Sequence, residues 1–263
     1  MNKIKIINEQ IELLESDDKI EVSLSNKLDI FDIIKLNIKI LEDTNIEVYY
    51  EDIDESKLDV LIEVLDNVNC NLYELKKEND VKVQYKYYLS ENSNLYVHKF
   101  YDCNSVKELD IIELNGVNAN IEYKFHTISK NNQKYDLMVY HNSRNTKSKI
   151  INKGVNIKDG SLEFNVTGVV YNGITDCEVD QNNRIITMNN NKCNINPNLL
   201  IEENDVIANH SALIGKFNEN EIFYLMSRGI KRDDAIKLLT KGFLYDETIF
   251  EEDIKNIIDT YWR

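Results

Sequence analysis

The clearest structural signals of the sequence lie in IEENDVIANHSALIGKFNENEIFYLMSRGIKRDDAIKLLTKGF, residues 201–243. Its first part is an extended segment that ends in Asn209-His210-Ser211, and its second part contains two amphipathic segments separated by Gly229. Polar and apolar residues alternate before Gly215, whereas apolar residues recur at helical spacing after it. This change of period predicts a β domain that ends near Gly215 and is followed by helices. A single histidine at the end of a strand, followed by two helices, indicates a binding surface more than a catalytic cleft.

Residues 216–263 carry the signals that begin and end helices. Asn218 can cap the first helix, and Gly229 follows its last turn, where a positive φ costs glycine little. Asp233 favours the start of a second helix through the helix dipole. We expect a third helix from about residue 248 to residue 260.

The segment 81–215 is rich in β-branched and aromatic residues and contains no long helical pattern. Asparagine, aspartate and glycine, which favour turns, separate its short apolar runs. We therefore expect an all-β core, for which a sandwich or a closed barrel is the default architecture. Residues 1–80 predict a short mixed α/β segment that includes an amphipathic helix over residues 1–16.

One spacing favours a different architecture. Cys177, Cys193 and His210 are separated by 16 and 17 residues. A coil of a flattened β-helix, with two strands of five or six residues and two turns, takes roughly 16–20 residues. The three side chains would then stack on one face, about 4.8 Å apart. Chance explains such spacings about as well, so the pattern by itself leaves the sandwich and the barrel open.

The chain has 46 acidic and 31 basic residues, and its formal net charge is −15. This charge argues against a nucleic-acid binder, because such proteins need a basic face to replace counterions, and against adhesion to anionic membranes. No apolar run approaches the roughly 20 residues that span a bilayer, and the first residues lack a secretory cleavage site. We expect a cytoplasmic protein with reduced thiols.

Motifs of common enzymes are missing from the sequence. It contains no GxxxxGK(S/T), GxSxG or HExxH, so we expect no enzyme activity and expect a partner to hydrolyse any ATP. No two cysteines form a CxxC pair. We interpret Cys70 and Cys103 as core residues, His141 as a turn-stabilising residue, and His98 and His126 as structural residues.

Several blocks between residues 114 and 243 resemble the SufB/SufD family of iron–sulfur cluster assembly scaffolds. The blocks are LNG (114–116), HNSRNTKS (141–148), NKGV (152–155), DGSLEFNVTG (159–168), QNNRII (181–186), PNLLIEENDV (197–206), NHSALIGKF (209–217) and FYLMSRGI (223–230). The last two blocks are highly specific in combination.

The resemblance implies a mainly β fold with three parts. Residues 1–80 would form the short N-terminal α/β segment, residues 81–215 a right-handed parallel β-helix, and residues 216–263 a C-terminal helical segment. Family members pair through their β-helices, so the partner would be the chain itself in a homodimer or a SufB/SufD-like paralogue in a heterodimer.

The family also implies an ATPase partner. The C-terminal helices of its members dock an ABC-type ATPase, SufC, whose closure is thought to twist the scaffold dimer and open its interface. In this chain Phe223, Tyr224 and Arg228 are the candidate residues for that contact, since aromatic residues and arginine are favoured at interfaces.

The family's interface histidine maps onto His210, which would bind iron or handle sulfur. The interface cysteine of SufB members falls at Asn191, and Cys193, two residues further along the same face of the strand, could take its place. Imidazole and thiolate are both ligands that suit iron. Cys177 is a third candidate for contact with the cluster. The cluster would be bound transiently, and two copies of two donors in a dimer could complete four ligand positions.

Two positions differ from the family pattern. SufD-like members often carry a cysteine where this chain has Ala208, and SufB members carry a glutamate where it has Ser211. The first hypothesis is therefore a scaffold for cluster assembly, and the alternative is a degenerate paralogue that keeps the dimer interface and the ATPase dock but binds no cluster. A β-helical carbohydrate enzyme is disfavoured, because the sequence shows neither an acidic cleft motif nor a secretion signal.

Overall fold

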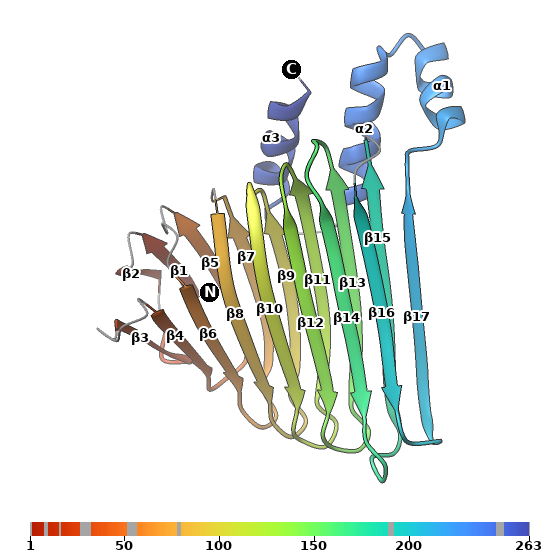
Figure 1. Ribbon diagram of the computed structural model, residues 1–263. Helices are drawn as coiled ribbons and strands as arrows, with labels where there is room; N and C mark the ends of the chain where they lie inside the picture. Colours follow the sequence, from red (N-terminus) through yellow and green to blue (C-terminus); the bar gives the residue numbers. More distant parts are fainter. Residues whose placement is uncertain are drawn as a thin grey trace.

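The computed structural model describes residues 2–7, 10–15, 17–26, 33–51, 57–77, 80–188, 192–245 and 250–262. The main body of the protein is a flattened parallel β-solenoid, in which the chain passes back and forth between two facing sheets (Figure 1). Strands of successive coils pair in parallel, which is the arrangement of a β-helix and not of a sandwich or barrel. The parallel β-helix implied by the resemblance is therefore confirmed.

Sheet A contains nine of the described strands. Its order is β17 (Val206–Gly215), β15 (Cys177–Thr187), β13 (Lys147–Asn156), β11 (Asn120–Ser129), β9 (Asn94–Tyr101), β7 (Asn69–Lys76), β5 (Thr44–Glu51), β1 (Asn2–Ile7) and β2 (Gln10–Glu15). Sheet B contains the other eight. Its order is β16 (Cys193–Ile201), β14 (Leu162–Val170), β12 (Gln133–His141), β10 (Ser105–Leu114), β8 (Asp80–Leu89), β6 (Lys57–Val64), β4 (Ile33–Ile40) and β3 (Ile20–Asn26).

One coil takes 25 to 31 residues, as the contacts Asn67–Asn92 and Lys147–Glu178 between successive coils show. The coil is longer than the expected 16–20 residues because the strands of the later coils have 8 to 11 residues instead of five or six. The expected stacking of residues 16 or 17 positions apart is therefore wrong.

The N-terminal region belongs to the same solenoid. The helix predicted for residues 1–16 is wrong, because residues 2–7 and 10–15 are strands that pair antiparallel as β1 and β2. Ile4 and Ile6 are buried and alternate with lysines, and β1 pairs in parallel with β5, far along the sequence. The described residues between Asn2 and Lys76 supply the first strands of both sheets.

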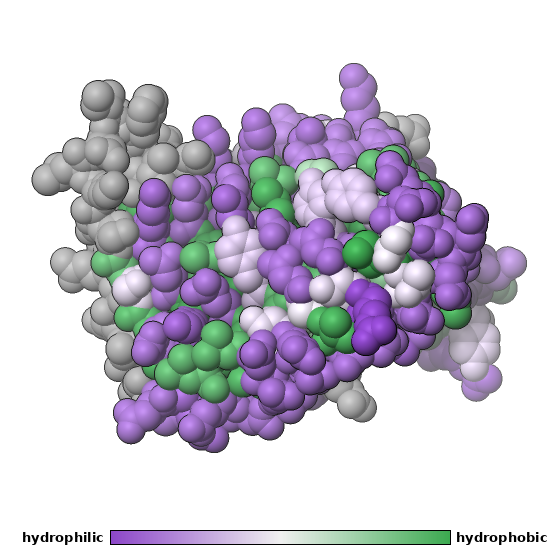
Figure 2. All heavy atoms as spheres, turned by 90° about the horizontal axis from the view of Figure 1, so that it is seen from below, coloured by the Kyte–Doolittle hydropathy of each residue, from purple (hydrophilic) through white to green (hydrophobic). Residues whose placement is uncertain are grey.

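Asparagine forms the turns at one end of the coils. Four asparagines there have φ between 54° and 61°; they are Asn67, Asn92, Asn118 and Asn145. The side-chain amide of each of the last three donates a hydrogen bond to the side-chain oxygen of the asparagine one coil before it. Asparagine tolerates this left-handed conformation better than other residues with a Cβ. Figure 2 views the molecule from this end, where the surface is mainly hydrophilic.

The helices are α1 (Glu219–Ser227), α2 (Arg232–Leu244) and α3 (Glu251–Tyr261). The predicted signals at α1 are confirmed: Asn218 Oδ1 accepts a hydrogen bond from the backbone N–H of Asn220 at 3.0 Å, and Gly229 has a φ of 87°. Residue 248, where we expected α3 to begin, lies outside the described residues. Within the described chain, no helix has the length and apolarity needed to cross a membrane.

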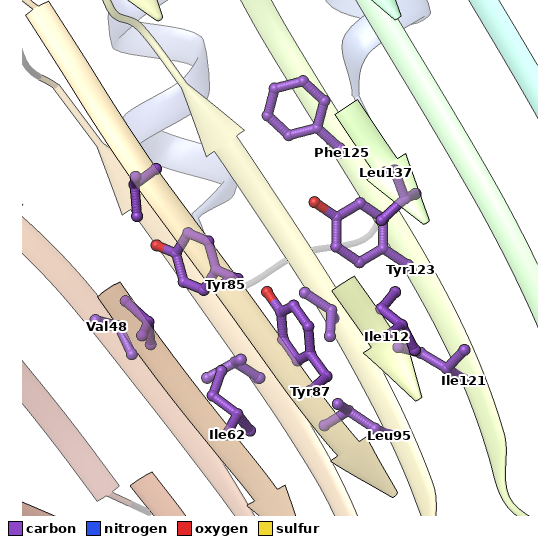
Figure 3. Packing of buried hydrophobic residues seen from close by; sticks show 14 of the residues in the cluster. Val48, Ile62, Tyr85, Tyr87, Leu95, Ile112, Ile121, Tyr123, Phe125 and Leu137 are labelled. Carbon is purple, nitrogen blue, oxygen red and sulfur yellow. The ribbon is translucent and has the colours of Figure 1, made fainter. Parts of the chain in front are cut away.

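Two of the three apolar clusters among the described residues organise the packing of the sheets and helices. The larger lies between the sheets, where side chains such as Tyr85, Tyr87 and Tyr123 point into the interior (Figure 3). The smaller joins the outer face of sheet A to α2 and α3, with Phe100 and Ile254 among its buried members. Helices α2 and α3 are thus anchored toward the upper end of sheet A (Figure 1). Helix α2 contacts β13, whereas Phe250, just before α3, packs against Tyr49 of β5 and Tyr73 of β7.

Candidate functional site

The last coil of the solenoid ends in two strands that each pair on one side only. Among the described strands, β16 ends sheet B and β17 ends sheet A. Unpaired edge strands expose backbone N–H and C=O groups that can pair with another chain. Large apolar side chains with exposed fractions of 45% to 63% accompany this edge; they are Leu200, Ile207, Leu213 and Ile214. We call β16 and β17 together the open end.

His210 lies in the middle of β17 and is exposed. It alternates in phase with Val206 and Ala208, both of which pack against the interior. The side of the strand that carries His210 is therefore the inner side, and it is accessible because no described strand follows β17. Gln181 on β15 is its register partner.

Gln181 also fixes the level of His210 relative to the facing sheet. Its Nε2 donates to the backbone oxygen of Asn198 on β16 at 3.3 Å. Gln181 is almost fully buried, and its side-chain oxygen accepts no hydrogen bond within the described residues. Asn198 in sheet B thus lies at the same position along the strand direction, or level, as Gln181 and His210 in sheet A.

Cys193 is the first residue of β16, and it lies at a different level of the open end. It is half-buried, packs against the main interior cluster and accepts a weak hydrogen bond from Asn156 Nδ2 at 3.6 Å. Asn198 lies five positions beyond Cys193, which is about 16 Å along a strand at roughly 3.3 Å per residue. Within one chain, Cys193 and His210 therefore share the open end but are not neighbours.

Cys177 does not join either of them. It begins β15, is buried, and pairs in register with Val206. Its Sγ lies 3.3 Å from Thr146 Oγ1 and 3.6 Å from the backbone oxygen of Ser143. Cys177 therefore belongs to a turn at the end of the coil, away from the level of His210.

His141 organises the same turn. Its Nδ1 lies 2.7 Å from Thr146 Oγ1, and its Nε2 lies 2.9 Å from Ser148 Oγ. Thr146 donates its own proton to the oxygen of Ser143 at 2.9 Å, so His141 Nδ1 donates to Thr146. Burial lowers the pKa of His141 to about 4 and keeps the imidazole neutral. The prediction that His141 stabilises a turn is confirmed.

The other candidates for a structural role are buried. Cys70 and Cys103 lie in the interior. His98 and His126 lie on the outer side of sheet A, with His98 Nε2 3.4 Å from His126 Nδ1. Asn191, the position that matches the SufB cysteine, lies outside the described residues.

Helix α1 presents an apolar face to solvent. Ile222 is its only buried residue, while Phe223 is 72% exposed, Tyr224 is 58% exposed and Met226 is 41% exposed. Arg228 lies against Tyr224, with its guanidinium carbon 5.3 Å from the ring centroid. The three residues predicted to contact a partner thus lie together on an accessible surface, which we call the α1 patch.

The family model described as "SUF system FeS cluster assembly, SufBD core domain" matches residues 44–243. The chain belongs to the SufBD core family. The match runs from β5 to α2, so it includes the open end and the α1 patch.

Curated relatives of this SufBD chain share limited identity with it. The iron–sulfur cluster assembly protein SufD of Bacillus subtilis is 31% identical over 113 residues, which are 43% of this chain and 26% of the relative. SufD of Escherichia coli is 25% identical over 173 residues, 64% of this chain and 41% of the relative. The SufBD family protein ycf24 of Galdieria sulphuraria is 29% identical over 109 residues, 39% of this chain and 47% of the relative. The matched segments span less than half the length of these relatives.

Sequence reasoning missed one feature of this SufBD solenoid, a set of charged residues in its interior. Lys99 is fully buried with Glu108 and Asp110. The available signal was strand alternation, because Lys99 is in phase with the apolar interior residues Val97 and Tyr101.

Proposed function

We propose that this chain is a scaffold subunit for iron–sulfur cluster assembly. It pairs with a second scaffold chain through the open end, and a SufC-like ABC ATPase binds the α1 patch and drives the pair. The observation that carries the proposal is the family match from β5 to α2, which includes both an unpaired sheet edge and an exposed apolar helix face.

Pairing through the open end is supported by backbone and side-chain chemistry. A second copy would satisfy the free edges of β16 and β17 and cover the exposed apolar side chains there. A two-fold axis presents the same surface from both subunits, as most homodimers do. The same surface could receive a SufB/SufD-like paralogue with a matching edge.

The positions of Cys193 and His210 determine how a dimer would bind an iron–sulfur cluster. A two-fold axis halfway between the levels of Cys193 and His210 would bring His210 of one subunit level with Cys193 of the other. Each site would then offer one imidazole and one thiolate to iron, both suitable donors. The remaining iron positions would be open to sulfide, which agrees with a cluster that is held only until it is passed on.

Anaerobic reconstitution with iron and sulfide tests this proposal. The wild-type dimer is expected to develop a cluster absorption band that Cys193→Ser and His210→Ala each abolish. Cys70→Ser is the control, because this thiol lies in the interior. A band that survives in both variants would overturn the assignment of the donors.

Binding of the ATPase is tested separately with the full chain and a purified SufC-like ATPase. Phe223→Ser is expected to weaken binding at least tenfold, since an exposed aromatic anchor commonly carries much of an interface's affinity. Tyr171→Ser is the matched control, because Tyr171 is 48% exposed but lies in a turn of the solenoid. Equal affinities for the two variants would exclude the α1 patch as the dock.

A second candidate function is supported by the separation of Cys193 and His210 within one chain. In this alternative, the protein is a paralogue that binds the ATPase and a partner scaffold without binding a cluster. Ala208, where SufD-like members often carry cysteine, packs against an interior cluster and offers no donor. No absorption band in wild-type protein, together with intact ATPase binding, would favour this adaptor function.

A further inference from the structure

The interior of the solenoid contains charged side chains for which the proposed function has no role. Five of them point into the space between the sheets, and each is at most 2% exposed; they are Glu74, Lys76, Lys99, Glu108 and Asp110. Three carboxyl groups thus face two ammonium groups. If all five were ionised, the interior would carry one uncompensated negative charge.

Lys99 is the centre of this set. Its Nζ lies 2.9 Å from Glu108 Oε1 and 2.9 Å from Asp110 Oδ2, so two carboxyl groups share one ammonium. Its Nζ also lies 3.4 Å from the centroid of the Tyr85 ring. Tyr123 donates a hydrogen bond to Asp110 Oδ2.

Glu74 is better compensated than the other two carboxyl groups. It accepts hydrogen bonds from Tyr85 at 2.7 Å and from Tyr101, and it lies 3.5 Å from Lys76 Nζ. Lys76 and Lys99 and these two hydrogen bonds hold the pKa of Glu74 below its usual value despite its complete burial. The excess negative charge therefore falls on Glu108 and Asp110.

Three polar atoms beside Lys99 lack a hydrogen-bond partner among the described residues. They are Glu108 Oε2, Asp110 Oδ1 and the hydroxyl of Tyr87. An unpaired charge in an apolar interior is strongly disfavoured, and a carboxyl group in such a place takes up a proton instead. The protonated group is then also a donor, which is what these acceptor atoms lack.

We propose that the solenoid interior is a binding site for one proton, which Asp110 holds beside Glu108 and the ammonium of Lys99. The bound proton brings the five charges to neutrality. Desolvation raises the pKa of Asp110 to about 7; the charge of Lys99 opposes this rise and that of Glu108 adds to it. The ligand is a proton and not a metal cation, because a cation would lie next to the Lys99 ammonium.

The titratable groups at and around the buried charges of Lys99, Glu108 and Asp110 come from several strands. They are Tyr50 on β5, Glu74 and Lys76 on β7, Tyr85 and Tyr87 on β8, Lys99 and Tyr101 on β9, Glu108 on β10, Tyr123 on β11 and Tyr135 on β12. Burial raises the pKa of all six tyrosines well above 10, so none of them ionises in the neutral range. The carboxyl groups and lysines therefore decide the charge of the interior.

Denaturant unfolding of the full chain as a function of pH tests the proposal. Between the unfolded and folded pKa values of Asp110, the folded state holds a proton that the unfolded state has lost, so wild-type stability falls as pH rises. Asp110→Asn removes this contribution. We expect the ratio of the wild-type to the variant unfolding constant to rise about a hundredfold from pH 5 to pH 8. Glu113→Gln on the outer side of β10 is the control and should keep the wild-type profile.

Charge counting supplies a second test. Asp110→Asn and Glu108→Gln each leave two carboxylates and two lysines, so each single variant should fold. The stability of each variant relative to the wild type should be highest above pH 7. The double variant leaves an uncompensated lysine. Its unfolding constant should be at least tenfold larger than the value obtained by combining the effects of the two single changes. A double variant equal to the sum of the singles would overturn the proposal.

Wild-type protein alone gives a direct readout. The infrared carbonyl band of a protonated carboxylic acid should be present at pH 6 and disappear as the pH passes about 8. Absence of the band at pH 6 would overturn the proposal. A stability at pH 8 that differs between sodium and potassium chloride at equal ionic strength would show that a metal cation occupies the site instead.

Discussion

Gln181 and His210 are register partners on neighbouring parallel strands, yet Gln181 is almost fully buried and His210 is exposed. The difference arises because β17 covers Gln181, whereas no described strand covers His210. The open end therefore presents to solvent the inner side of a coil, which every earlier coil buries.

His210→Ala should separate binding from stability. Because the side chain is exposed, we expect the free energy of unfolding to change by less than about 0.5 kcal/mol. Iron bound after anaerobic reconstitution should fall by at least half, as measured by metal analysis of the folded protein. A variant that binds iron normally would remove His210 from the proposed site.

Gly168→Ala should destabilise the last coils. A Cβ at Gly168 would lie 2.7 Å from Val179 Cγ1 and 3.2 Å from Gln181 Nε2. Overpacking of this kind costs about 1–3 kcal/mol, which denaturant unfolding would measure. Gly242→Ala is the control: it has open space within α2, and alanine at a helical position should stabilise by about 0.5–1 kcal/mol. Equal stability of the two alanine variants would contradict close packing around Gly168.

His141 should make the protein less stable in acid. Its pKa is lowered to about 4 by burial, so below the usual value of 6.5 the unfolded state binds a proton that the folded state does not. Stability contributed by the neutral imidazole is thus complete above about pH 6.5 and is lost as the pH falls towards 4. The loss is up to about 3 kcal/mol in the free energy of unfolding. In His141→Asn, the change in this free energy between pH 7 and pH 4.5 should lack that contribution. An unchanged pH profile in this variant would contradict the prediction.

Asn118 should tolerate glycine better than alanine. Its φ is 61°, and its side chain links Asn92 and Asn145 in the ladder of turn asparagines. Both substitutions remove the side-chain hydrogen bonds, but alanine also strains the left-handed backbone by about 1 kcal/mol. We therefore expect Asn118→Ala to unfold at lower denaturant than Asn118→Gly, and equal midpoints would exclude backbone strain as the cause.

The interior charges illustrate which features strand alternation could and could not reveal. The alternation of side chains along β9 places Lys99 in the interior. Alternation alone does not predict that Glu108 and Asp110 lie within hydrogen-bond distance of Lys99 Nζ. The partners belong to different sheets and meet only when the solenoid closes. The same holds for Cys193 and His210, whose levels depend on where each strand starts in its coil.

The sequence by itself determined the local features of this protein. The change of period near Gly215, the cap at Asn218 and the positive φ at Gly229 all depend on a few neighbouring residues. The family blocks added the parallel β-helix.

The tertiary structure was needed to establish the coil length, the strand character of residues 2–7 and 10–15, and the positions of the thiols, the imidazole and the buried charges. Each of these depends on pairing between residues 25 or more positions apart, or across the two sheets. A local pattern of apolar spacing contains no information about such distant partners, because helix and strand periods overlap in short segments.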